Sequence, residues 1–319
     1  EDTRQLFFAL AASPRFRDIR VMGYTEQFDL VSEKQFSATT FQVCPDLYYI
    51  AFRGTDSTFV GWKEDFNMAF KAPIPSQEEA VRYIEKAALY CQGNIYTGGH
   101  SKGGNLAIYA SVMCSAKAKE KIVEVQSFDS PGFTEDFVES KNYLETESKI
   151  LKFVPEDSMI GMLLNDTASY RIVKSDGEGI HQHDPFLWNV ENNDFVTGEK
   201  IHSKAKFVNS TFKEWVNNFT PEQRELFVDA MFDIVEATNV QKAESFVDWS
   251  ENLKGNTSLI LDTIKDLDPE TRSFMLKVLR NIFPSATDSV LTKPKSIIKN
   301  TWGKIKSKRI DVEDNSTES

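Results

Sequence analysis

Residues 96–107 read Tyr-Thr-Gly-Gly-His-Ser-Lys-Gly-Gly-Asn-Leu-Ala and contain the pattern Gly-x-Ser-x-Gly centred on Ser101. The residues before this serine predict a strand over 94–97, and those after it predict a helix over 103–116. Glycines on both sides of Ser101 remove side chains that would collide in a tight turn between strand and helix. The stretch therefore predicts a nucleophile elbow that presents the Ser101 hydroxyl. The alternative is a glycine-rich turn without catalytic meaning.

The chain around this turn alternates strand-like and helical segments. An amphipathic helix is expected over 77–90, because its apolar residues recur on one face. Apolar, β-branched and aromatic runs predict strands at 35–43, 47–52, 122–128 and 150–154. The short turn at 44–46 joins the first two strands into a hairpin. This alternation predicts an α/β fold with a mostly parallel sheet flanked by helices.

The character of the sequence changes after residue 208. We predict an α/β catalytic domain over 1–208, an all-helical subdomain over 209–291 and a charged terminal segment over 292–319. Two helices of the subdomain are expected to begin at Thr220 and Asp268, because each is followed by a proline at the first helical position.

Composition restricts the class of protein. The chain has 319 residues, of which 40% are apolar and 27% charged, as in soluble globular proteins. The longest clean apolar run, 6–12, is too short to span a bilayer, and the residues after Glu1 do not show the basic-then-apolar pattern expected of a secretory peptide. The net charge of -11 argues against nucleic-acid binding. Three cysteines far apart predict reduced thiols and a cytoplasmic location.

The segment 293–309 carries seven basic residues and no acidic residue. Ile297, Ile298, Trp302 and Ile305 recur within it at near-helical spacing. These features favour a terminal helix that packs its apolar residues on the helical subdomain while its lysines stay in water. The alternative is a basic amphipathic helix that binds an anionic membrane surface peripherally.

A serine nucleophile needs an imidazole base and an acid that holds the tautomer of that base. We expect the acid to be Asp157, in the turn that follows the strand at 150–154. Asp129, which ends the strand at 122–128, is the alternative acid.

His183 is the expected base among the four histidines, because it lies in a loop rich in turn and aromatic residues. His100 is expected to pack or hydrogen-bond within the sheet, and His202 is expected to be a surface residue. A metal site at His181, His183 and Asp184 is the alternative use of this loop, but it needs more ligands than the neighbouring sequence offers. We therefore expect neither a metal nor a cofactor.

The end of the strand at 47–52 is expected to supply an oxyanion donor. Thr55 follows this strand and offers both an N–H and a hydroxyl group. A buried Asp65 is expected to accept hydrogen bonds from Arg53 or Thr55 and so fix the loop. An ordinary turn with a surface salt bridge is the alternative. The helix after Ser101 contributes further N–H groups to a developing oxyanion.

Several of these stretches together resemble the class 3 (fungal-type) lipases. The chain is more similar still to a bacterial class 3 lipase-like α/β-hydrolase family, and the match covers roughly residues 13–190. The resemblance is carried by Gln35–Ala38, Tyr49–Thr55, Gly61–Asp65, Gly99–Ala107, Phe128–Gly132 and Gln182–Asp184.

The resemblance implies an α/β-hydrolase fold with nucleophile Ser101, acid Asp157 and base His183. It also implies oxyanion donors at Thr55 and Lys102, the latter standing where lipases often carry a smaller or apolar residue. We expect the protein to hydrolyse a carboxylic ester of an acyl lipid through an acyl-enzyme intermediate. The alternatives are a non-catalytic lipid-binding or membrane-binding scaffold and an acyltransferase or amidase.

Overall fold

The computed structural model describes residues 2–29, 32, 34–55, 64, 67–68 and 73–202, together with isolated later positions (206, 210, 220, 222–226, 229, 265, 267, 269, 272–273 and 276). The chain divides into two compact units, one of residues 1–233 with 241–245 and one of residues 234–240 with 246–319. Apart from the isolated positions, the expected helical subdomain and the charged segment with 293–309 lie outside the described residues.

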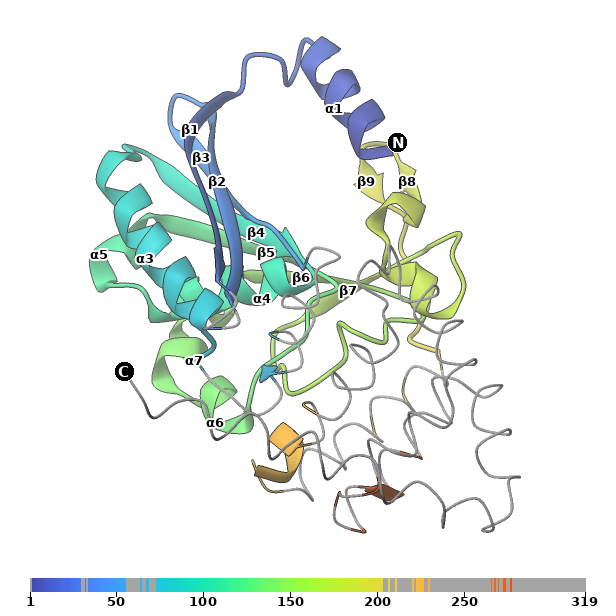
Figure 1. Cartoon of the computed structure of the whole chain (residues 1–319). Helices are drawn as coiled ribbons and strands as arrows, with labels where there is room; N and C mark the ends of the chain where they lie inside the picture. Colours follow the sequence, from blue (N-terminus) through green and yellow to red (C-terminus); the bar gives the residue numbers. More distant parts are fainter. Residues whose placement is uncertain are drawn as a thin grey trace, which may run out of the picture. The chain divides into compact units, whose positions relative to one another are not determined.

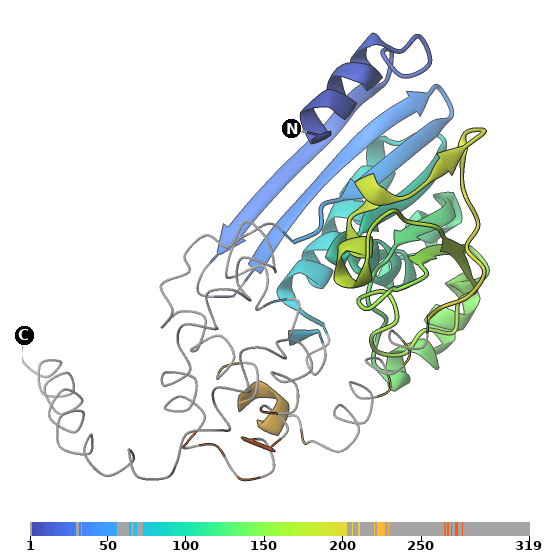
Figure 2. The same cartoon turned by 90° about the vertical axis from the view of Figure 1, so that its right-hand side faces the viewer.

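A seven-stranded sheet forms the framework of the first unit (Figure 1). Its strands are β1 (Arg20–Asp29), β2 (Lys34–Cys44), β3 (Leu47–Phe52), β4 (Asn94–His100), β5 (Ile122–Phe128), β6 (Ile150–Pro155) and β7 (Tyr170–Val173). The spatial order is the order in sequence. β1, β2 and β3 are antiparallel, and the pairs from β3 to β7 are parallel. The predicted hairpin and the mostly parallel sheet are confirmed. The long strands β1 and β2 are prominent in Figure 2.

The strand order explains where the helices lie. Parallel strands that follow one another in a single direction, with right-handed crossovers, place all the crossover helices on the same face of the sheet. Figure 1 shows α3, α4 and α5 gathered on that side. The α-helices with defined bounds within residues 2–202 are α1 (Asp2–Ala12), α3 (Pro75–Tyr90), α4 (Lys102–Met113), α5 (Ala116–Lys121), α6 (Glu135–Val138) and α7 (Lys141–Glu147).

The main core lies between this face and the helices. Its fully buried members come from the alternating inward positions of the strands and from the apolar stripes of α3 and α4. They include Phe36, Ile50, Ile84, Ile95, Leu106 and Ile108. Burying side chains of this size is the main source of stability for such a sheet.

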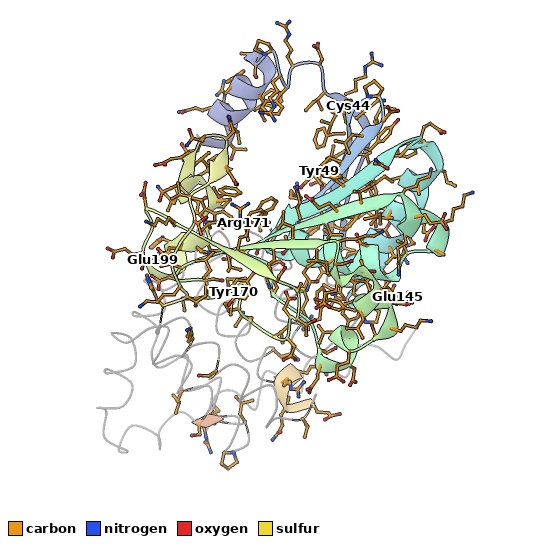
Figure 3. The ribbon with its side chains drawn as sticks, turned by 180° about the vertical axis from the view of Figure 1, so that it is seen from behind. Cys44, Tyr49, Glu145, Tyr170, Arg171 and Glu199 are labelled. Atoms are coloured by element: carbon orange, nitrogen blue, oxygen red, sulfur yellow. The ribbon has the colours of Figure 1, made fainter. Side chains whose placement is uncertain are left out.

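The segment after β7 forms a second, smaller cluster on β5 and β6. It contains the short 3₁₀ helices η1 (Gly179–His183) and η2 (Pro185–Leu187) and the hairpin β8 (Val190–Glu191) and β9 (Asp194–Phe195). Trp188 and Phe195 pack against Phe128 and Phe153 in this cluster. The rings of Phe128 and Phe153 are stacked, with their centroids 5.3 Å apart. Arg171, labelled in Figure 3, lies over the ring of Phe153 and forms a 2.9 Å ion pair with Asp194 of the hairpin. These contacts hold the segment that contains His183.

Among the described residues, no helix has the length and apolar character needed to cross a bilayer.

Replacing Ile95 tests the part of the main core that β4 contributes. Ile95 on β4 is fully buried, so Ile95→Ala is expected to lower the free energy of unfolding by about 2–5 kcal/mol. Val123 on the neighbouring β5 is 43% exposed, and Val123→Ala is expected to change it by less than about 0.5 kcal/mol. Urea unfolding measures both values, and equal losses would contradict the assigned core.

Candidate active site

Ser101 lies between β4 and α4 in a strained backbone conformation, with φ 57° and ψ -130°. Such a conformation is uncommon for a residue with a side chain, and strain of this kind is concentrated at functional turns. The Ser101 N–H donates to the carbonyl of Phe128 at 3.0 Å, which fixes the turn to β5. The strand and helix expected on either side of the serine are both present, and α4 begins at Lys102.

The loop after β3 lies directly against this turn. A Cβ on Gly54 would lie 2.7 Å from the carbonyl oxygen of His100 and 3.6 Å from the Cβ of Ser101. The glycine therefore permits a backbone approach that no other residue allows without a shift. The half-buried Thr55 follows Gly54 immediately.

Arg53 ties this loop to β1. Its guanidinium pairs with Glu26 at 2.7 Å, and both side chains are about half exposed. Its backbone N–H donates to Ser37 of β2 at 3.0 Å. The expected partner of Arg53, Asp65, lies outside the described residues.

Asp129 holds the imidazole of His183. It follows β5 with φ 48°, a left-handed conformation that aspartate tolerates better than most residues, and it is completely buried. Its Oδ2 accepts from His183 Nδ1 at 2.6 Å, and its Oδ1 accepts from Ser158 Oγ at 2.5 Å and from the N–H of Gly161 at 3.1 Å. With the His183 proton on Nδ1, the lone pair of Nε2 is left to accept a proton.

Asp157 does not make the contact expected of it. Its Oδ1 accepts from Nδ1 of His202 at 2.9 Å. Its N–H donates to the side chain of Gln182 at 2.8 Å, and Gln182 Nε2 donates back to its Oδ2 at 3.3 Å. The expected pairing of Asp157 with His183 is therefore replaced by that of Asp129. The reason is the strand order, since β5 is the direct neighbour of β4, whereas β6 is one strand further away.

His202, expected as a surface residue, is exposed and paired with Asp157. Gln182, the residue before His183, fastens the loop to Asp157 after β6, a role that was not predicted. No pattern in the sequence indicates that pairing, because it joins residues 25 positions apart.

His100 supports the same loop. Its Nε2 donates to the carbonyl of His183 at 2.7 Å, and the two rings lie 4.4 Å apart at an angle of 38°. The pKa of His100 is lowered to about 4, mainly because the ring is buried and secondly because His183 lies close to it. His100 was expected to hydrogen-bond within the sheet, but its ring instead bonds to the loop that carries His183. Side chains alternate along β4, so that Thr97 faces α4 while His100 faces the loop.

The described residues show no hydrogen bond from Ser101 Oγ to either imidazole. The contacts of Ser101 and its neighbour nevertheless connect the turn to both members of the Asp129–His183 pair. Ser101 follows His100, whose ring lies on that of His183, and its N–H is held by the residue before Asp129. Catalytic hydrogen bonds are often long in unliganded sites and shorten when substrate binds.

The side chains of the histidine loop are not gathered as the alternative metal site would require. His181 is exposed, and His183 is occupied by Asp129. Within the described part of the chain, no group of three His, Cys, Asp or Glu side chains is arranged to hold a metal ion.

The fold and the site define an α/β protein with a strained serine at a strand-to-helix turn and a buried aspartate–histidine pair at the end of the neighbouring strand. The chain belongs to the Mbeg1-like family, whose model matches residues 10–233. No curated protein is significantly similar to it in sequence.

Solved structures with some similarity include three lipases. The native Rhizomucor miehei lipase propeptide complex has a TM-score of 0.37 at 16% identity, over 49% of this chain and 57% of that one. The M37 lipase has a TM-score of 0.38 at 12% identity, over 90% and 91%. The Lip2 lipase from Yarrowia lipolytica has a TM-score of 0.33 at 12% identity, over 50% and 66%. At TM-scores below 0.5, these similarities carry no functional conclusion.

The lowered pKa of His100 predicts a specific pH dependence. In the unfolded chain this ring binds a proton below about pH 6.5, whereas in the folded chain it does so only near pH 4. His100 therefore makes the folded state less stable as the pH falls through this window. His100→Gln keeps a donor for the His183 carbonyl, and it is expected to flatten the fall in unfolding free energy between these pH values. Urea unfolding at a series of pH values checks this, and unchanged slopes would contradict the assignment.

Proposed function

We propose that the protein is a serine hydrolase that cleaves carboxylic esters of acyl lipids through an acyl-enzyme. The observation that carries the proposal is the 2.6 Å hydrogen bond between His183 Nδ1 and buried Asp129, whose preceding residue, Phe128, accepts the N–H of the strained Ser101. A base held in one tautomer next to a serine on a sharp turn is what activation of a hydroxyl nucleophile requires.

The first step acylates the serine. Ser101 Oγ attacks the ester carbonyl carbon while its proton passes to Nε2 of His183. The carboxylate of Asp129 stabilises the imidazolium that forms, and Ser158 and Gly161 keep this carboxylate in place. The tetrahedral intermediate then collapses. His183 returns the proton to the leaving oxygen, so that an alcohol departs and the acyl group stays on Ser101.

The second step releases the acid. Water attacks the acyl carbonyl and gives its proton to Nε2 of His183, which then protonates Ser101 Oγ as the carboxylic acid leaves. In both steps, we assign stabilisation of the oxyanion to the backbone N–H groups of Lys102 and Thr55. Lys102 is the first residue of α4, where N–H groups lack intrahelical partners and the helix dipole favours negative charge.

An acyl lipid is the substrate class that the resemblance to class 3 lipases favours. The surroundings of the base agree with it. Phe186 and Leu187, which follow His183 within the same loop, expose 46% and 36% of their surface. Exposed apolar side chains can line a site for an acyl chain, because contact with the chain removes apolar surface of both from water.

Asp157 has a different part in the proposal. It holds both polar ends of the Gln182 amide, and Gln182 also donates to Gly177 within the same loop at 3.1 Å. We therefore assign Asp157 to positioning the segment that carries His183, and Asp129 to the acid of the triad.

Removing the nucleophile tests the proposal. The wild-type protein is expected to react with a fluorophosphonate and to hydrolyse p-nitrophenyl esters, because both need an activated serine. Ser101→Ala is expected to abolish labelling and to reduce turnover by at least about a thousandfold. Gel fluorescence and nitrophenol release measure these effects, with unfolding curves as the control for folding. Fluorophosphonate labelling that persists in Ser101→Ala would contradict the proposed mechanism.

Exchanging the two carboxylates for amides separates their roles. Asp129→Asn is expected to lower kcat about ten-thousandfold, because the wrong tautomer of His183 is then favoured. Asp157→Asn preserves the triad and is expected to lower kcat by less than about a hundredfold. Steady-state kinetics on a short p-nitrophenyl ester compares the variants. A larger loss for Asp157→Asn than for Asp129→Asn would restore Asp157 as the acid.

A further inference from the structure

The side chain of Lys102, next to the nucleophile, is buried in an ionic network. Lys102 and Glu64 expose 0% and 1% of their side chains, and Lys102 Nζ lies 3.0 Å from Glu64 Oε2. The same ammonium group donates to the carbonyl oxygen and to Oε1 of Gln35, each at 2.8 Å. Its three donors thus meet three acceptors in a place from which water is excluded.

Glu64 connects this lysine to two further elements. Its Oε2 accepts from the N–H of Gln35 on β2, and its Oε1 accepts from the N–H of Ser76 at the start of α3, each at 3.0 Å. Ser76 Oγ in turn donates to the Gln35 carbonyl at 3.0 Å. The network therefore joins the beginnings of α3 and α4 to the beginning of β2.

The two ends of the network lie at two parts of the proposed machinery. One end is the residue that follows Ser101. The other is Gln35, two residues before Ser37, whose carbonyl accepts the N–H of Arg53 in the loop that carries Thr55. The network thus spans from the nucleophile to the strand that supports the oxyanion loop.

A second polar side chain of α4 supports the acid turn in a similar way. Asn105 accepts from Gln77 of α3 at 2.8 Å. It donates to the carbonyls of Pro131 and Gly132 at 3.2 and 3.0 Å, shortly after Asp129. The first turn of α4 is therefore fixed on both flanks by buried hydrogen bonds.

Stability alone is a weak reason for such a pair. Replacing a buried ion pair with well-packed apolar side chains is often neutral or stabilising, because the charges must be desolvated. A directional network has a different effect, since it allows only one relative placement of the groups that it joins.

We propose that Lys102 and Glu64 are positioning residues that hold the Ser101 turn at a fixed place relative to the N–H groups of the loop 53–55. This inference rests on the function proposed above. Its consequence is that the network contributes to the rate of acylation and not to the binding of the ester. Misplacing catalytic groups by about 1 Å can cost about a hundredfold in rate.

The chain offers a matched control in a second buried lysine–carboxylate pair. Lys152 Nζ on β6 lies 2.6 Å from Asp166 Oδ2, with 3% and 14% of the side chains exposed. Asp166 also accepts from the hydroxyl of Tyr143 at 2.8 Å. Neither member of this pair contacts the elbow, the loop 53–55 or His183 among the contacts that the structure gives.

The experiment compares Lys102→Met, Lys152→Met and the double variant Lys102→Met/Glu64→Gln. We measure kcat and KM on a short p-nitrophenyl ester, at a temperature where circular dichroism shows each protein folded. Lys102→Met is expected to lower kcat about tenfold to a hundredfold with KM within about twofold. Lys152→Met is expected to leave kcat within about twofold. The double variant, which leaves no unpaired charge, is expected to regain stability but not kcat.

Amide hydrogen exchange gives a readout that does not depend on activity. Lys102→Met is expected to raise exchange in both 53–55 and 101–105, whereas Lys152→Met is not. The inference is overturned if Lys102→Met keeps wild-type kcat, if its loss equals that of Lys152→Met, or if exchange at these segments is unchanged. A wild-type protein that reacts with no ester and no fluorophosphonate would refute the proposed function instead, and exchange alone would then decide the inference.

Discussion

The hydrogen bond between His183 and Asp129 joins two parts of the chain that are 54 residues apart. It fixes a loop that follows the last strand of the seven-stranded sheet to the end of a central strand, and it leaves the lone pair of Nε2 to accept a proton. The aromatic cluster around Trp188 brings the loop to the sheet, and His100 and Gln182 fasten it there. Those contacts determine where the loop lies. The bond to Asp129 determines what its histidine can do.

The arrangement of the site follows from the order of the strands. β3, β4 and β5 are neighbours and parallel, so their carboxyl ends meet at one edge of the sheet. Thr55, Ser101 and Asp129 each come just after one of these ends. Open α/β sheets commonly place their binding sites at such an edge. Because the crossover helices occupy one face, the other face near β5 and β6 is left for the segment that supplies His183.

Much of this could be predicted from the sequence, because the signals are local. The hairpin of β2 and β3, the helix α3 and the glycine-rich turn at Ser101 each have a recognisable period or turn chemistry. The choice between Asp129 and Asp157 has no such signal. Both follow an apolar strand, and the decision depends on strand order and on the left-handed backbone at Asp129. The Lys102–Glu64 pair was equally hidden, since its members are 38 residues apart and carry the residue types of solvated surfaces.

The most direct test of the account is an NMR measurement of the ring N–H proton that His183 shares with Asp129. A short bond to a buried carboxylate is expected to give a strongly deshielded resonance in the wild-type protein. We predict that this resonance persists in Asp157→Asn and disappears in Asp129→Asn and His183→Gln. A resonance that survives in Asp129→Asn, or that is lost in Asp157→Asn while the protein stays folded, would contradict the pairing on which the proposed chemistry depends.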